Sequence, residues 1–394
     1  MKSNYNKIGQ YIRLIDERNF DLKVETLLGL TINKDFIPSV ANTVGSDMSR
    51  YKIIRKNQFA CSLMQVRRDK KIPVALQRNY KEAIISQAYP VFDVTNKDEL
   101  LPEYLMMWFS RSEFDREACF YAVGGVRGSL EWEDFCNMQL PVPDIEKQKA
   151  IVKEYNKIVN RIKLNEQLNQ KLEEIAQAIY KEWFVDFEFP MTKEYAESIG
   201  KPELEGKASK ANGGEMVWNE ELGNEIPKGW DSCEIIELFE LQRGFDLPIQ
   251  KRVKGDTPIY AANGLTDFHN ESKVKGPAIV TGRSGTIGNV FYVSKDCWPL
   301  NTTLWIKSFN LATPIYAYFI LKNTELKGFH SGSAVPTLNR NDIHALTTIR
   351  PYRDLIEKFE EQQNKAFSHV DVIVKEVEKL IFLKDMLLSK MAKA

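Results

Sequence analysis

The sequence contains few of the residues that build disulfide-bonded or metal-centred proteins. Among its 394 residues are 5 cysteines and 4 histidines, and no two cysteines form a Cys-x-x-Cys pair. Scattered cysteines in a protein of a reducing compartment are usually free thiols that fill cores. We therefore expect neither disulfides nor a zinc site.

Long hydrophobic runs are missing as well. The apolar runs, such as the one around Met106 to Phe109, fall far short of the ~20 residues of a membrane span. The segment Met1 to Lys7 is polar and lacks an apolar signal region. The sequence predicts a cytoplasmic chain without a membrane partner. Its 43% hydrophobic and 27% charged residues suit two or three globular domains.

The chain has no net charge, which at first argues against a nucleic-acid partner. The charge is nevertheless uneven: Arg50 to Lys81 holds ten basic residues and one acid, Asp69, whereas Asp186 to Glu225 holds ten acids and four bases. Phosphate binding needs only a local basic surface, because the field decays over a Debye length of ~8 Å. A solvated sheet edge is the simpler interpretation of the basic run taken alone.

Motifs of catalysis are also absent. Pro143-Asp144-x-Glu146-x-x-Lys149 is too compressed for a nuclease site and stands at a helix start, where acids favour the helix dipole. We find no adenosylmethionine-binding glycine pattern and no base-flipping tetrapeptide. The histidines show no spacing typical of metal ligands or of a catalytic triad: His269, His330, His344 and His369. The sequence predicts no catalytic residue, no metal site and no cofactor bound by this chain.

The chain does contain an internal repeat. An offset of 208 residues aligns Leu130 with Leu338 and Pro143 with Pro351, and it continues to Leu172 with Leu380. Each half ends in a strand-like stretch, a proline and a long helical pattern. This arrangement predicts a duplicated architecture with pseudo-two-fold symmetry.

Two long helices are expected, over about 144–185 and 354–391. Their apolar positions alternate by four and three, as in a coiled-coil seam. The predicted seam consists of Ile151, Tyr155, Ile158, Ile162, Asn165, Asn169, Leu172, Ala176, Ile179 and Trp183 in the first helix, and Phe359, Ala366, Val370, Ile373, Val377, Leu380, Leu387 and Met391 in the second. Two amphipathic helices packed separately are the alternative; matched length favours an antiparallel pair.

The predicted fold class is α+β, with two mixed α/β heads separated by this pair of helices. Strand-like content marks 51–66 and 83–94 in the first head, and 275–293 and 298–308 in the second; 102–118 and 314–323 are helical in pattern. The expected boundaries are 1–143 for the first head, 144–189 for the central helix, 190–228 for a polar acidic linker, 229–351 for the second head and 352–394 for the last helix.

A glycine-rich segment, Gly282 to Asn289, lies between two predicted strands. It matches neither Gly-x-Gly-x-x-Gly nor a P-loop, and no helical pattern follows it. One interpretation is a hairpin loop that presents polar side chains to a DNA groove. A plain hairpin turn is equally compatible with these residues.

The residues resemble the specificity subunits of type I restriction-modification systems over essentially the whole chain. The resemblance rests on four segments: Leu172 to Phe187, Ile226-Pro227-Lys228-Gly229-Trp230, Gly282 to Val293 with Trp298 to Thr303, and Pro336-Thr337-Leu338-Asn339. A proline followed by Glu-x-Gln, as at Pro143, Glu146 and Gln148, usually opens each helical region of this family. The second copy departs from this pattern after Pro351, which suggests that its helix start docks a partner differently.

The resemblance implies a non-catalytic DNA-binding subunit. Each head would recognise one half of a split, asymmetric target in double-stranded DNA, and the helices would set the spacing. Two methyltransferase subunits and the restriction/translocase subunits would be the partners, and they would carry adenosylmethionine, ATP and magnesium. The first head lacks the Gly-Arg-Ser-Gly loop of the second, which fits two different half-sites.

The expected DNA contacts are polar and basic residues in both heads. Arginine can bond guanine, and asparagine or glutamine can bond adenine, while lysines serve phosphates. The candidates are Arg67, Arg68, Lys70, Lys71, Arg78 and Gln87 in the first head, and Lys273, Arg283, Ser284, Thr286, Asn289 and Asn301 in the second.

Three alternatives remain open at this point. The chain could be an enzyme fused to its own DNA reader, although the missing motifs count against that. It could be a coiled-coil adaptor that binds proteins and not DNA. It could also be the specificity subunit of another restriction type, with the same heads and a different catalytic partner.

Overall fold

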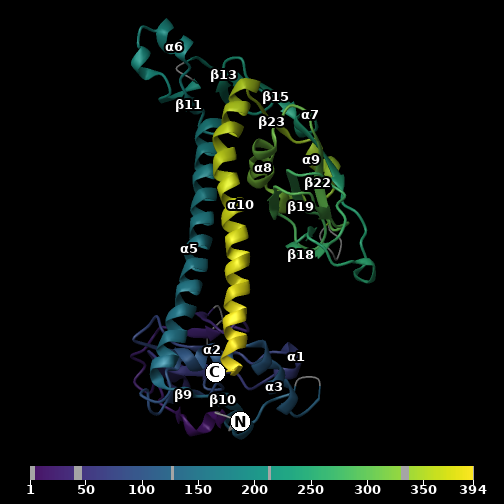
Figure 1. Ribbon diagram of the computed structural model, residues 1–394. Coiled ribbons are helices and arrows are strands. Elements are labelled where there is room, and N and C mark those ends of the chain that lie inside the picture. The colour runs from purple at the N-terminus through teal and green to yellow at the C-terminus, as the bar shows by residue number, and fades with distance from the viewer. Residues whose placement is uncertain (1–4, 40–46, 126–127, 212–213, 330–336, 394) are drawn as a thin grey trace. The chain divides into compact units, whose positions relative to one another are not determined.

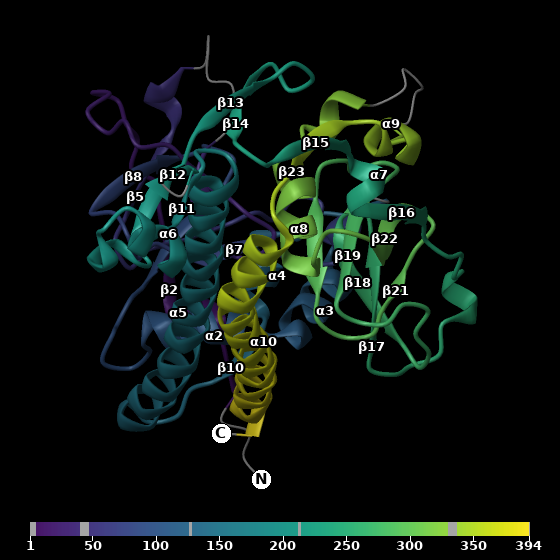
Figure 2. The same cartoon turned by 90° about the horizontal axis from the view of Figure 1, so that it is seen from above.

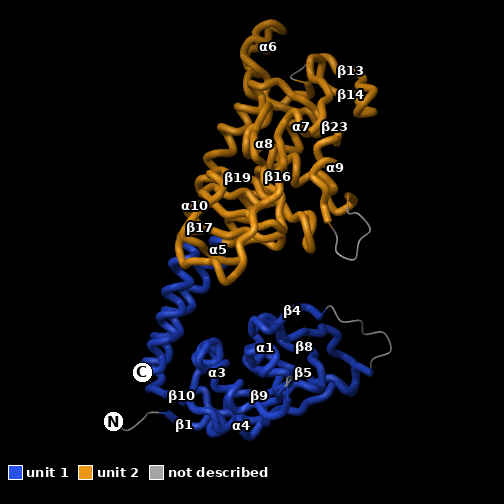
Figure 3. Tube along the Cα trace, turned by 90° about the vertical axis from the view of Figure 1, so that its right-hand side faces the viewer, with its two compact units in different colours: residues 1–165, 376–394 blue, residues 166–375 orange. Residues whose placement is uncertain are grey.

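The computed structural model describes residues 5–39, 47–125, 128–211, 214–329 and 337–393. The chain divides into two compact units, Met1–Asn165 with Glu376–Ala394 and Glu166–Lys375 (Figure 3). Each unit contains one globular head and one end of each long helix. We call the globular parts head 1, from β1 (Tyr5–Lys7) to β10 (Gln139–Pro141), and head 2, from β15 (Asp231–Glu234) to β23 (Thr347–Arg350).

The two long helices are α5 (Ile145–Phe184) and α10 (Arg353–Lys390). In each unit they lie side by side and run in opposite directions (Figure 1). The Asp144 carboxylate accepts a hydrogen bond from the backbone N–H of Lys147 and so caps α5, directly after Pro143. Every predicted seam residue is buried or half-buried, with Asn165 only 3% exposed. The predicted helix pair is confirmed.

Head 1 is built around a four-stranded antiparallel sheet in the order β2-β9-β6-β7. Phe59 and Phe92 stack across this sheet, and Phe109 closes the aromatic core behind them. The strands of head 1 are β1 (Tyr5–Lys7), β2 (Ile12–Ile15), β3 (Leu28–Leu30), β4 (Phe36–Pro38), β5 (Lys52–Arg55), β6 (Phe59–Cys61), β7 (Val74–Leu76), β8 (Glu82–Ile85), β9 (Val91–Val94) and β10 (Gln139–Pro141). Its helices are η1 (Ile8–Gln10), η2 (Met48–Arg50), α1 (Val66–Asp69), α2 (Pro102–Phe109), α3 (Ser112–Tyr121) and α4 (Trp132–Asn137).

Head 2 repeats this plan with the sheet β16-β22-β19-β20, again antiparallel throughout. Its strands are β15 (Asp231–Glu234), β16 (Phe239–Arg243), β17 (Thr257–Ala261), β18 (Gly264–His269), β19 (Ala278–Gly282), β20 (Val290–Val293), β21 (Trp298–Pro299), β22 (Thr303–Phe309) and β23 (Thr347–Arg350). Its helices are α7 (Ile235–Leu238), η5 (Ile249–Lys251), α8 (Pro314–Asn323), η6 (Leu326–Phe329) and α9 (Arg340–His344). Helix α8 lies between the sheet and α10 (Figure 1, Figure 2).

The duplication extends to the strand that precedes each long helix. In head 1, β10 pairs antiparallel with the first strand of the head, β1, and in head 2, β23 pairs antiparallel with β15. The heads differ outside these shared parts. Head 1 adds the pairs β3–β4 and β5–β8, whereas head 2 adds the three-stranded sheet β18-β17-β21. The internal repeat that the sequence predicts is therefore present in the strand order.

Each head core is completed by the end of a long helix. In unit 2, Tyr180, Trp183 and Phe184 of α5 join the main hydrophobic core of head 2. In unit 1, Leu388 of α10 and Met391 of η7 (Met391–Lys393) join the core of head 1. The aromatic end of the central helix is thus core, because its rings are buried among those of head 2.

The segment 190–228, which the sequence assigns to a linker, contains regular elements. They are β11 (Glu188–Pro190), α6 (Lys193–Ser198), η3 (Pro202–Leu204), β12 (Ala208–Lys210), β13 (Met216–Asn219) and β14 (Asn224–Pro227). The strands pair as two short hairpin-like ladders, β11–β12 and β13–β14. Phe189 stacks on Trp230 at 5.5 Å, so the segment is anchored by a few aromatic contacts that its polar composition hides.

Candidate nucleic-acid interface

The glycine-rich loop of head 2 joins β19 to β20 and is held by backbone hydrogen bonds. The N–H groups of Arg283 and Ser284 donate to the carbonyl of Thr302 at 2.8 and 3.1 Å, and Leu338 N–H donates to the Arg283 carbonyl at 2.8 Å. A Cβ atom on Gly282 would lie 1.9 Å from the Thr286 carbonyl oxygen, so this position requires glycine. The result is a fixed hairpin loop in which Thr286 and Asn289 are exposed.

A second segment, Arg243 to Asp246, packs against the neighbouring Pro299 to Asn301. Phe245 N–H donates to the Pro299 carbonyl at 2.8 Å, and the Asn301 amide bonds the Asp246 carboxylate. A Cβ atom on Gly244 would lie 2.2 Å from the carbonyl oxygen of Leu300. This segment was not among the predicted contacts, although Gly244 directly after a strand, between Arg243 and Phe245, is a signal for it in the sequence.

Lys273 lies at the same edge of head 2, where its side chain contacts an aromatic ring. Its ammonium lies 4.9 Å from the ring centroid of Trp298, and its backbone N–H donates to the Cys297 carbonyl. Trp298 precedes the segment that contacts the glycine-rich loop. All six residues predicted in head 2 therefore lie on this loop or on the segments linked to it.

Four of the residues predicted in head 1 follow one another on and after α1. The Arg67 guanidinium donates to the Gly124 carbonyl at 3.2 Å, and its stem covers Gly128. Arg68 pairs with the adjacent Asp69 at 2.7 Å, which removes part of its charge from any phosphate. Lys70 and Lys71 follow as exposed cations with no ion pair among the described residues.

Lys71 and Arg78 also line a groove of about 800 Å³ in unit 1. The long helices contribute Lys163 and Lys384 to its lining. Because these four cations line the same groove, it offers phosphates a local positive field despite the zero net charge of the chain. Two exposed acids, Asp35 and Asp385, lie in the same lining and weaken that field.

Gln87 stands apart from the other predicted residues. It is exposed in the turn between β8 and β9. Among the described residues, no hydrogen bond or ion pair links its side chain to the loop after β6 or to the groove. The structure therefore does not bring it together with the rest of the candidate interface.

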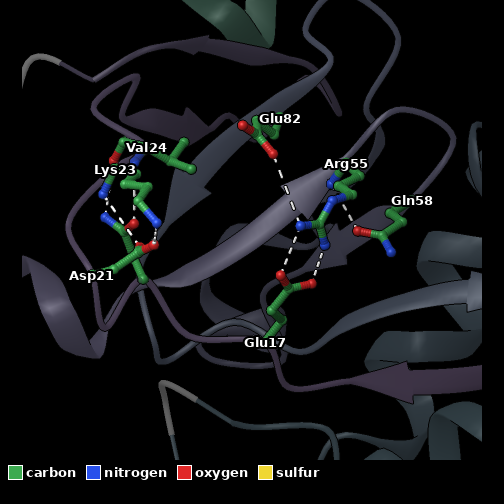
Figure 4. A network of polar contacts seen from close by, with 8 residues as sticks. Glu17, Asp21, Lys23, Val24, Arg55, Gln58 and Glu82 are labelled. Atoms are coloured by element: carbon green, nitrogen blue, oxygen red, sulfur yellow. Dashed lines mark hydrogen bonds and ion pairs between the residues drawn. The ribbon is translucent and has the colours of Figure 1, made fainter.

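Much of the basic run from Arg50 to Lys81 is used inside head 1. Arg55 on β5 bonds the carboxylate of Glu17 and lies 3.8 Å from that of Glu82 (Figure 4). The same guanidinium holds the pKa of Glu17 below its ordinary value, chiefly through the hydrogen bond. Lys52 and Arg50 likewise approach Asp16 and Asp47. Arg55 thus links β5 to β8, and these pairings leave the region after β6 as the basic surface.

No catalytic or metal centre emerges from the described part of the chain. Within residues 5–39, 47–125, 128–211, 214–329 and 337–393, no three His, Cys, Asp or Glu side chains gather as metal ligands. His344 Nε2 accepts the Leu241 N–H, and His269 bonds the backbone of Val253. His330 and Pro336 lie outside the described residues. The helices in the described ranges also include none that is long and apolar enough to cross a membrane.

The comparison with known families decides the identity of this architecture. Residues 68–174 and 227–351, more than half of the chain, match the model described as the type I restriction modification DNA specificity domain. The chain belongs to this family. One match falls in each half and the first extends along α5, in agreement with the repeated heads.

Individual specificity subunits support the same assignment. The type I restriction enzyme MjaIX specificity subunit of Methanocaldococcus jannaschii is 24% identical over 323 residues, which cover 76% of this chain and 70% of that protein. The HindI specificity subunit of Haemophilus influenzae is 32% identical over 119 residues, covering 30% of this chain and 26% of that protein. A crystal structure of a type I S subunit from M. genitalium shares the fold, with a TM-score of 0.56 at 14% identity, covering 99% of this chain and 96% of that chain.

The predicted resemblance is therefore confirmed, as is the α+β fold class with two heads on long helices. Specificity subunits are the non-catalytic members of type I restriction enzymes. This membership, and not the lack of a visible active site, assigns the chemistry to other subunits.

Proposed function

We propose that this specificity subunit binds double-stranded DNA and that each head recognises one half of a split, asymmetric target. The observation that carries the proposal is the repetition of one sheet order with different side chains at equivalent edges. Head 2 presents a short Gly-Arg-Ser-Gly loop, and head 1 presents a longer loop with Arg67, Arg68, Lys70 and Lys71. Two copies of one scaffold with different contact residues suit two different half-sites.

We further propose that the paired helices fix the distance between half-sites and bind two methyltransferase subunits. Beyond the mutual seam, both helices expose apolar side chains that an isolated pair leaves in water. These side chains are Leu164, Leu168 and Ile175 on α5, and Val372, Val374, Phe382, Leu383 and Met386 on α10. Leu164, Leu168 and Ile175 are spaced by four and seven residues and share one face, which suits a further helix from a partner.

The complex would be completed by restriction/translocase subunits. In this proposal adenosylmethionine lies on the methyltransferase, and ATP and magnesium lie on the translocase, with no cofactor on the present chain. Such an assembly acts on cellular and incoming DNA, which would place the chain in the cytoplasm. The two-fold repeat of the chain favours one methyltransferase for each half.

The test is methylome sequencing of a methylation-null host that carries this chain with its neighbouring methyltransferase. The same host without this chain is the control. We expect adenine methylation at one split, asymmetric motif that disappears when this chain is omitted. Methylation that does not depend on the chain would overturn the proposal and favour a protein adaptor, which would also show no sequence-dependent shift on duplex DNA.

The test also addresses a different restriction type. If methylation depends on the chain but adenosylmethionine transfer and DNA cleavage reside in a single partner polypeptide, the heads keep their proposed role and the host complex is not type I. Purification of the complex and identification of its subunits by mass spectrometry separates these two outcomes.

A further inference from the structure

The loop that follows β6 in head 1 is the structural counterpart of the glycine-rich loop of head 2. Both loops join the equivalent inner strand to the edge strand of the same sheet order, β6 to β7 and β19 to β20. The loop of head 1 spans 62–73 and the loop of head 2 spans 283–289. The sequences share no motif, so the correspondence is visible only in the fold.

Two equivalent hydrogen bonds align the loops residue by residue. One closes each loop, from Ser62 N–H to the Pro73 carbonyl at 2.8 Å and from Gly282 N–H to the Asn289 carbonyl at 3.2 Å. The other ties the next residue to the repeat-related leucines. Leu130 N–H donates to the Leu63 carbonyl at 2.9 Å, and Leu338 N–H donates to the Arg283 carbonyl at 2.8 Å. Leu63 therefore corresponds to Arg283, and Met64 to Ser284.

The next position has the same unusual backbone in both heads. Gly285 has φ +86°, and Gln65 has φ +63°. Glycine adopts this left-handed conformation without strain, whereas a long side chain adopts it at a cost in free energy. Head 1 therefore keeps a strained glutamine where head 2 has glycine. Strain that persists at one residue points to a use for its side chain.

The preceding residue is equally unusual for its surroundings. Met64 is 47% exposed although it is a large apolar residue on a loop surrounded by cations. Val66, two positions later, is fully buried and anchors α1 in the core of head 1. The buried Val66 holds the loop in place on one side, and the end of β6 holds it on the other. Met64 and the half-buried Gln65 therefore lie at fixed positions between them.

We infer that Met64 and Gln65 are the base-recognising residues of head 1, at the place that Ser284 and Gly285 hold in head 2. A methionine side chain suits apolar contact with the methyl group of thymine, and a glutamine amide can bond both N6 and N7 of adenine. The inference rests on the proposed DNA recognition and assigns an adenine-thymine pair to the half-site of head 1. The cations Arg67, Lys70 and Lys71, further along the same loop, would then hold phosphates on either side.

The test uses the full chain with its methyltransferase in the methylation-null host. It compares the DNA motifs that become methylated with the wild type and with each variant. Gln65→Gly gives head 1 the glycine that head 2 has, which relieves strain and removes the amide. Met64→Ser makes the matching change one residue earlier. We expect each variant to lower the preference for an adenine-thymine pair at one position of one half-site about tenfold, within the range of one base contact. The other half-site should not change.

The matched control is Asn57→Gly. Asn57 also has φ +68° in head 1, in the turn after β5, so the change likewise places glycine at a left-handed position, away from the loop. We expect it to leave both half-sites as they are. Binding of the purified complexes to duplexes with each base at each position provides a second measurement, which covers a variant that no longer supports methylation.

The outcomes separate the inference from the proposed function. If the wild-type chain directs no motif, the proposed function fails and the inference with it. If the wild-type chain directs a motif and both variants discriminate among bases as the wild type does, only the assignment of Met64 and Gln65 is overturned. Relaxation confined to one half-site, and absent in Asn57→Gly, supports it.

Discussion

A buried ion pair fixes the β3–β4 hairpin on head 1. Lys34, in the turn of that hairpin, donates to Asp115 Oδ1 at 2.8 Å and to the Phe109 carbonyl. Asp115 also accepts the Ile72 N–H at 3.1 Å. The two charged side chains are only 8% and 11% exposed, so water contributes little to their solvation. The pair is therefore more sensitive to the loss of one partner than a surface pair.

We predict that Asp115→Asn lowers the free energy of unfolding of unit 1 by about 3–5 kcal/mol, because the variant leaves the Lys34 charge buried without its partner. The asparagine can still accept from Ile72 N–H, which isolates the effect of charge. Urea unfolding followed by near-ultraviolet circular dichroism measures the change. Asp21→Asn, at the exposed pair with Lys23 (Figure 4), is the control and should leave the midpoint where it is. Equal midpoints for all three proteins would contradict the prediction.

The same pair predicts a pH dependence. Burial lowers the pKa of the Lys34 ammonium below its ordinary value, and the Asp115 carboxylate offsets only part of that shift. An ammonium with a lowered pKa binds fewer protons in the folded chain, so the folded state gains stability as pH rises toward the unfolded pKa of ~10.4. In Asp115→Asn the carboxylate no longer offsets the effect of burial, so the pKa of Lys34 falls further and the variant gains more stability than the wild type. The stability gap between Asp115→Asn and the wild type should therefore narrow from pH 7 to pH 10. A gap that widens over this range would show that Lys34 is not the titrating group.

Gln148 fastens the start of α5 to head 1. It is fully buried, accepts the Leu101 N–H at 2.9 Å and donates to the carbonyls of Glu99 and Pro143 at 2.7 and 2.8 Å. In unit 2, Glu360 of α10 accepts the Ile315 N–H at 3.0 Å, at the start of α8. Each long helix thus bonds the start of one head helix, α2 in head 1 and α8 in head 2, through a different side chain.

We predict that Gln148→Leu destabilises unit 1 by about 2–3 kcal/mol, because one buried and two partly buried backbone groups lose their hydrogen bond to this side chain. Hydrogen exchange detected by mass spectrometry should show faster exchange over residues 99–105, where α2 begins. Gln167→Leu, at an exposed position of the same helix, serves as the control. Unchanged exchange over 99–105 in Gln148→Leu would show that the buried amide does not fasten the helix.

At the scale of elements, the helix pair contains polar residues within its buried face. Asn165 and Gln363 are 3% and 2% exposed. The Gln363 Nε2 group has no hydrogen-bond partner among the described residues. A buried amide without a partner weakens packing, although a polar residue in a seam can fix the register of two helices.

We expect Gln363→Met to raise the free energy of unfolding of unit 2 by about 1–2 kcal/mol, because it removes an unpaired amide at nearly constant volume. The adjacent Gln362 is exposed, and Gln362→Met should change little. Thermal unfolding of both variants beside the wild type checks this. A lower melting temperature for Gln363→Met would indicate that the amide has a partner in solution.

The elements also show the limits of pattern reasoning. The seam of the helix pair was predictable because an apolar period of three and four residues involves only residues that are close in sequence. The elements in 190–228 were not, because each is only three to six residues long and depends on contacts such as that of Phe189 with Trp230. Short strands carry too little periodic signal to separate them from a loop.

At the scale of the whole molecule, the proposed spacing role of the helices makes a prediction about length. A heptad inserted after Gln167 of α5, with a matching heptad after Val372 of α10, keeps the seam in phase and lengthens both helices by about 10 Å. At ~3.4 Å per base pair, the gap between half-sites should grow by about three base pairs. Methylome sequencing of the variant reads the gap directly. A motif with unchanged half-sites and an unchanged gap would exclude the helices as the spacer.

The sequence by itself determined the duplication, the long helices and the family, because offset identities, helical periodicity and motif segments are local properties of the chain. Only the tertiary structure decided which basic side chains are free of internal ion pairs and so available to DNA phosphates. Arg55 is held by Glu17, 38 residues away in sequence, whereas Lys70 and Lys71 remain without an ion pair among the described residues. It also decided that the loop after β6 matches the glycine-rich loop. Ser62 and Leu63 make backbone hydrogen bonds within head 1 that are equivalent to those of Gly282 and Arg283 within head 2, although their side chains differ. Backbone hydrogen bonds do not depend on side-chain identity, so such a correspondence leaves no trace in the sequence.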